Sequence, residues 1–228
     1  MLFTLSRLSY LGLSLSFGWL SWRFWNNYRK EKDTISENFS NFQFFLAIGT
    51  FLFFLETFVP ISDFVFKEWL WIAGLFFVNT GFSFAGYLVF YLRFPKIPPA
   101  FGFRVFFIWG TAIMFSTVVL PIRFFVFPDG QIELFLPPLT AIMTFGLILV
   151  TSLPLGIIII KQALTLKSQK ERIKSLSLGV TCLAGVTAAL FFTLISTLEL
   201  RLILSIIMVL GVIFLSRFVT QGKIPEVK

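Results

Sequence analysis

Charged side chains inside apolar runs are the candidate functional residues of this 228-residue sequence. Glu56 lies within the apolar run Phe51–Val59, and Arg123 follows Pro121 near the end of another such run. A charge inside a membrane is costly, so such groups pair with one another or mark a binding or ion pathway. We predict that Glu56 and Arg123 lie at similar depth and pair in the interior of a helical bundle.

Three further charged residues, Arg7, Glu199 and Arg201, fall towards the same side of the predicted bundle. Together with Glu56 and Arg123 they could line a shallow polar pocket that binds a ligand or an ion. The alternative interpretation is that charged groups near the ends of spans extend into the lipid headgroups. The sequence leaves both interpretations open.

A second polar set lies in the middle of an apolar segment. Asn79, Ser83 and Tyr87 are spaced four residues apart and therefore share one face of a helix. Hydrogen bonds between neighbouring helices would explain this face, and a substrate path is the alternative.

Several kinds of chemistry are excluded by the composition. The sequence has no histidine and a single cysteine, Cys182. Histidine haem ligation, imidazole acid–base catalysis and dithiol redox chemistry are therefore beyond this polypeptide. No lysine lies within 202–218 to form a retinal Schiff base, and no glycine-rich phosphate loop is present. We expect a non-enzymatic protein with no catalytic residue, metal or cofactor.

We predict that these residues are carried by membrane-spanning helices. Hydrophobic residues make up 57% of the chain and charged residues 13%, which is too apolar for a soluble domain of this size. Runs of about 20 apolar residues are long enough to cross a bilayer as helices. We predict an all-α fold, a single seven-helix transmembrane domain over residues 1–228. The predicted spans are 2–22, 42–62, 69–92, 104–127, 138–160, 177–197 and 202–218.

Lysine and arginine are distributed unevenly between the predicted loops. With the N-terminus outside, the outer side holds only Arg7, Lys67, Arg123 and Arg201, and all other Lys and Arg lie inside. Positive charge accumulates in cytoplasmic loops, so this distribution predicts an N-out, C-in orientation in the plasma (inner) membrane. The net charge of +8 therefore serves orientation, and we expect no nucleic-acid partner. Trp19, Trp22 and Trp25 are expected to anchor the inner end of the first helix at the interface.

Two segments resemble one another. Gly49-Thr50 through Phe64-Val65-Phe66 recurs sixty-one residues later as Gly110-Thr111 through Phe125-Val126-Phe127. A parallel duplication would explain the similarity, and so would a shared bias towards Phe and Val.

The predicted architecture resembles the N-terminal seven-helix sensor modules of some bacterial histidine kinases. The N-out topology and the basic inner segment from Lys161 to Leu176 carry the resemblance. Only about ten residues follow the last predicted span, which leaves no output domain, so we expect the module to act through a partner.

Two functional hypotheses follow. The first is a sensor, ligand-binding protein or accessory subunit, whose partners are the lipid bilayer, a membrane protein and a small apolar or lipid-like ligand. The alternative is a small-solute or ion-coupled transporter that uses Glu56.

Overall fold

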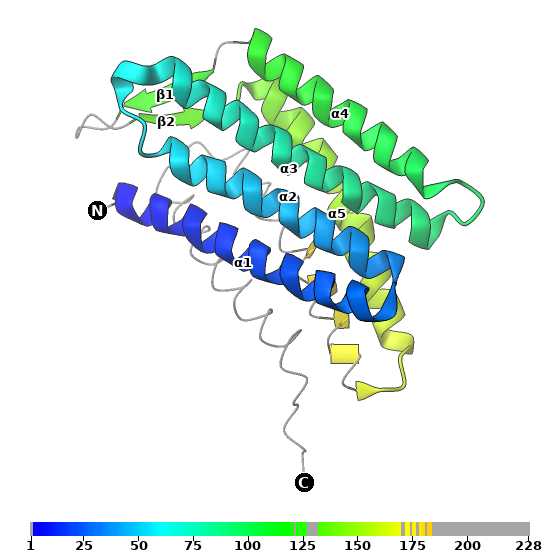
Figure 1. The fold of residues 1–228 in the computed structure, drawn as a ribbon. Helices are drawn as coiled ribbons and strands as arrows, with labels where there is room; N and C mark the ends of the chain where they lie inside the picture. The colour runs from blue at the N-terminus through cyan, green and yellow to red at the C-terminus, as the bar shows by residue number, and fades with distance from the viewer. Residues whose placement is uncertain are drawn as a thin grey trace.

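The described part of the chain folds as a helical bundle with one short β-hairpin (Figure 1). The computed structural model describes residues 2–120, 122–126 and 132–169, together with 172, 173, 175, 176, 178–180, 182 and 183. Four long helices, α1 to α4, lie side by side in sequence order, and α5 packs across α3 and α4 (Figure 1). Their bounds are α1 Leu2–Glu31, α2 Thr34–Glu56, α3 Phe64–Arg93, α4 Pro99–Val119 and α5 Pro138–Thr165, with a 3₁₀ turn, η1, at Ile61–Asp63.

Helix α3 lies at the centre of the described bundle, in contact with α2, α4 and α5. The side chains of Ala85 and Leu88 on α3, Ile113 on α4, and Leu147 and Leu155 on α5 are completely buried. Burial on this scale lets neighbouring helices interlock through dispersion contacts, which drive helix association where the surroundings are apolar.

Glycines set the distance between α3 and its neighbours. A Cβ added at Gly49 would lie 2.7 Å from the carbonyl oxygen of Gly74 and 2.6 Å from Val78 Cγ2. A Cβ added at Gly110 would lie 2.9 Å from Asn79 Cβ, on the next residue of α3 after Val78. The two matching glycines of the similar segments therefore contact adjacent residues of the central helix.

A two-residue turn joins α1 to α2. Lys32 has φ 53°, the left-handed conformation that ends a helix, and its N–H donates to the Tyr28 carbonyl over 2.7 Å. Asp33 then caps α2, accepting hydrogen bonds from the N–H groups of Ile35 (3.0 Å) and Ser36 (2.9 Å). The stretch 23–41 separates the predicted spans 2–22 and 42–62. Both helices extend through it, so α2 begins at Thr34 rather than 42.

The predicted span 104–127 and the all-α class both need correction at one place. Helix α4 ends at Val119, and the apolar residues that follow form β1 (Arg123–Val126), which pairs antiparallel with β2 (Ile132–Phe135). Pro121 cannot continue the helical hydrogen bonding, and a run of aromatic and β-branched residues suits a strand. Residues 127–131, between the two strands, lie outside the described residues.

Four of the predicted spans correspond to helices that are long and apolar enough to cross a membrane, namely α2, α3, α4 and α5. Their length and composition indicate an integral membrane protein. Helix α1 covers the predicted span 2–22, but Arg7 and several serines make it less apolar, and it is not among these four. The predicted spans 177–197 and 202–218 lie largely or wholly outside the described residues, so the count of seven stays a prediction.

Candidate functional site

Glu56 forms a buried ion pair with Lys67. Lys67 Nζ lies 2.7 Å from Glu56 Oε1, and the two side chains are 8% and 3% exposed for Glu56 and Lys67 respectively. The same ammonium group donates to the backbone carbonyl of Glu56 over 3.1 Å. Glu56 is the last residue of α2 and Lys67 lies in the first turn of α3, so the pair ties the two helices at the bend between them.

Arg7 reaches the same end of α2 from α1. Its Nη2 donates to the Thr57 carbonyl over 2.7 Å, and its guanidinium carbon lies 4.5 Å from the centroid of the Phe58 ring. The structure therefore brings together Arg7 and Glu56, two of the five charged residues predicted to share a pocket. Their contacts hold the ends of α1, α2 and α3 together.

Of the other three charged residues in the predicted pocket, the structure describes only the backbone of Arg123. Arg123 opposes Phe135 in the β-hairpin, but its side chain lies outside the described part of the chain, so its pairing with Glu56 stays a prediction. Glu199 and Arg201 lie outside the described residues altogether.

The polar face of α3 is less uniform than its spacing indicates. Ser83 donates to the Asn79 carbonyl of its own helix over 3.1 Å, whereas Tyr87 is half-buried and stacks on Tyr91. The Asn79 side chain is buried, and neither its oxygen nor its nitrogen has a hydrogen-bond partner among the described residues. The predicted hydrogen bonds between helices do not involve Ser83, which is satisfied within α3.

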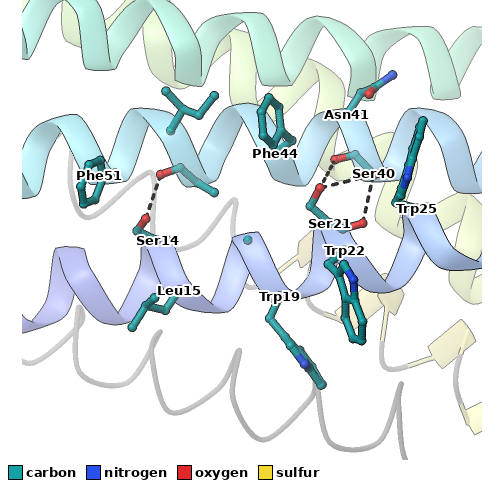
Figure 2. Close-up of a pocket in the computed structure, with 13 residues that line it drawn as sticks. Ser14, Leu15, Trp19, Ser21, Trp22, Trp25, Ser40, Asn41, Phe44 and Phe51 are labelled. Carbon is teal, nitrogen blue, oxygen red and sulfur yellow. Dashed lines mark hydrogen bonds between the residues drawn. The ribbon is translucent and has the colours of Figure 1, made fainter.

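A groove lies between α1 and α2 (Figure 2). Its volume of about 720 Å³ lies within the range of small-molecule sites, roughly 300–1,000 Å³. The walls are mainly apolar and aromatic. They include Leu15, Trp19, Trp22 and Trp25 from α1 and Phe44, Ile48 and Phe51 from α2.

Serines bind the two helices together along this groove. Ser21 Oγ donates to the Ser40 carbonyl and Ser40 Oγ to the Ser21 carbonyl, both over 3.0 Å. Ser14 Oγ donates to the Ala47 carbonyl over 3.0 Å, seven residues or about two turns further along the helices (Figure 2). Small hydroxyl residues allow this approach, and their hydrogen bonds leave the groove with a predominantly apolar lining.

Space in the groove is set by Gly18. A Cβ added there would meet only Ala47 Cβ, at an ordinary van der Waals distance of 3.9 Å. The position therefore accepts a methyl group, whereas a larger side chain would extend into the groove.

Charge adjoins the groove at the end nearest the α1–α2 turn. The guanidinium carbon of Arg23 lies 5.2 Å from the ring centroid of Trp19 and 5.7 Å from that of Trp22. Both indoles line the groove, so their stacking holds an exposed cation beside its wall.

Sequence reasoning missed Lys67 and the groove. Lys67 was assigned to an outer loop, although its position eleven residues after Glu56, across Pro60, was the available signal. Trp19, Trp22 and Trp25 recur every third residue, and this spacing was interpreted only as interfacial anchoring. A groove depends on which faces of two helices meet, and no single helix carries that information.

Comparison with protein-family models, curated proteins and solved structures gave no significant match. The functional argument therefore depends on the site itself. Among the described residues, no group of three or more Cys, Asp or Glu side chains is arranged to hold a metal ion.

Proposed function

We propose that this protein is a non-enzymatic integral membrane protein that binds a lipid-like ligand in the α1–α2 groove. In this proposal it acts as a sensor or accessory subunit, and a membrane protein partner receives the signal. The groove is the observation that carries the proposal, because its size and apolar lining suit a ligand of this kind.

The accessibility of the groove supports a ligand that arrives from the bilayer. Leu15 is 66% exposed and Phe44 50% exposed, and Trp22 and Phe51 are exposed as well. In a helical membrane protein such side chains face hydrocarbon, so a groove between them opens sideways into lipid. An acyl chain can enter there without leaving an apolar environment.

The Glu56–Lys67 pair supports binding over the alternative, a transporter that uses Glu56. A coupling carboxylate must exchange its proton or ion during transport, whereas Glu56 is buried against a lysine that also binds its backbone carbonyl. Such a pair is costly to break, because one partner would remain charged in an apolar site.

The resemblance to kinase sensor modules suggests how binding would be transmitted. We expect the N-out, C-in orientation in the plasma membrane, with the basic segment 161–176 on the cytoplasmic side. The partner would then contact this inner side.

The test is purification of the tagged protein in mild detergent, followed by mass spectrometry of everything that co-purifies. We expect a bound lipid and a stoichiometric membrane protein. Gly18→Leu should lose the lipid, while the matched control Gly18→Ala keeps it. A lipid retained equally by both variants would show that the groove is not its site.

A further inference from the structure

We infer that the groove selects an anionic phospholipid, with the acyl chain between α1 and α2 and the phosphate on Arg23. This inference rests on the proposed lipid-binding function and adds the headgroup class to it. Its basis is the guanidinium of Arg23, which is held against the groove wall at one end.

The groove has the form that a lipid requires. Its α1 wall runs from Ser14 to Trp25, a distance of about 16 Å along the helix axis. Towards Ser14 the lining is aliphatic and aromatic, and the cation lies at the tryptophan end. Tryptophan is enriched at the level of lipid headgroups, so the cation would lie where a headgroup lies when the chain fills the groove.

Arg23 is suited to hold a phosphate. Its side chain is exposed, and its described contacts are with the ring faces of Trp19 and Trp22, so the guanidinium N–H groups stay available. A guanidinium binds a phosphate through two parallel hydrogen bonds, and the indoles restrict the orientations that it can adopt.

The acidic residues near the turn, Glu31, Asp33 and Glu37, form no ion pair with Arg23 among the described residues. Glu31 lies eight residues after Arg23, about 12 Å further along α1. Asp33 is engaged in capping α2, where it accepts two backbone hydrogen bonds. The cation adjoining the groove wall is therefore available to an anion, which favours a phosphatidylglycerol-type headgroup over a zwitterionic one.

Native mass spectrometry of the full chain in detergent tests this inference. The protein is titrated with phosphatidylglycerol or with phosphatidylcholine of the same acyl chains. We expect the wild type to retain phosphatidylglycerol preferentially, and Arg23→Gln to lower this preference about fivefold, the effect of removing one basic residue from a membrane surface. Arg23→Lys should keep part of the preference, because it keeps the charge but loses the paired hydrogen bonds.

Arg93→Gln is the matched control. Arg93 ends α3, which runs antiparallel to α2, so the same charge is removed at the same end of the bundle but away from the groove. An unchanged preference in Arg93→Gln supports the inference. Equal binding of both lipids, or equal losses in Arg23→Gln and Arg93→Gln, would overturn headgroup selection while lipid binding stands. Binding of neither lipid, or a dimer whose groove excludes lipid, would overturn the proposed function as well.

Discussion

Lys67 Nζ lies 2.7 Å from Glu56 Oε1 and also donates to the backbone carbonyl of Glu56. One lysine thus holds both the side chain and the main chain at the end of α2. Two apolar helices turn back on one another here, and the ion pair places opposite charges together where neither is well solvated.

Replacing one partner of this ion pair should destabilise the protein more than replacing both partners. We expect Glu56→Gln and Lys67→Met each to lower the stability in detergent by about 3 kcal/mol, because each leaves a buried charge without its partner. The double variant should lose less than the sum. The control is Glu68→Gln, next to Lys67 in the sequence, which should change the stability by less than about 0.5 kcal/mol. Thermal unfolding measures all four variants, and additive losses would show that the pair is not coupled. Adding Arg123→Gln to the same series tests the predicted contact between Glu56 and Arg123.

The contact between α2 and α3 should not tolerate a methyl group at Gly49. A Cβ there would lie 2.7 Å from the Gly74 carbonyl oxygen, which belongs to the backbone and cannot rotate away. We expect Gly49→Ala to cost about 1–3 kcal/mol through overpacking. Gly18→Ala is the control, because its Cβ meets only Ala47 at 3.9 Å. Equal melting temperatures for the two variants would contradict this account of the packing.

The cap of α2 should make stability dependent on pH. Partial burial acts to raise the pKa of Asp33, but hydrogen bonds from the Ser36 side chain and from the N–H groups of Ser36 and Ile35 outweigh it, so the pKa falls below its usual 3.8. Because the pKa of Asp33 is lower in the folded state than in the unfolded state, its carboxylate stabilises the fold. This stabilisation is complete at pH values above the unfolded-state pKa and is lost as the pH falls through the folded-state pKa. Asp33→Ala should cost about 1 kcal/mol near pH 7. The difference from wild type should shrink below about pH 4, near the pKa of an unperturbed Asp. Asp33→Asn keeps a capping group and should lose this pH dependence; a wild type that retained its full advantage at pH 2 would argue against the cap.

Labelling of single cysteines tests the proposed orientation. In a variant that lacks Cys182, a cysteine at Ser168 should resist an impermeant thiol reagent in intact cells, because the basic segment after α5 is expected inside. A cysteine at Ser62, exposed between α2 and α3, should react. The opposite pattern would place the N-terminus in the cytoplasm.

The sequence predicted the apolar helices well because each carries its own evidence. Gly, Pro and charged residues mark the ends of the apolar runs that form α2 to α5. Helix α2 nevertheless begins at Thr34, eight residues before the predicted start at 42. Polar residues between Arg23 and Asn41 suggested a loop, yet a polar helix can extend beyond the hydrocarbon, and a single left-handed residue, Lys32, is enough to turn the chain. The hairpin after Val119 was missed because its Phe-rich strands are as apolar as a helix.

The candidate site was less predictable because it depends on pairs of helices. Glu56 was correctly singled out as an unusual buried charge, but its partner among the described residues is Lys67. Distance along the sequence placed Lys67 in a loop, whereas the bend at Pro60 returns it to Glu56. The serines at 14, 21 and 40 are unremarkable alone, and only the close approach of α1 to α2 gives them partners.

Fluorescence of the groove tryptophans tests lipid binding most directly. Phosphatidylglycerol with brominated acyl chains is titrated into the detergent-solubilised protein at limiting lipid, with Trp69, Trp71 and Trp109 replaced by Phe. The remaining emission then comes from Trp19, Trp22 and Trp25. If the acyl chain lies in the groove, tryptophan emission should fall in a saturable manner in this protein and in its Gly18→Ala variant. The Gly18→Leu variant should lose the saturable part of the quenching. Identical quenching in all three proteins would contradict a lipid site between α1 and α2.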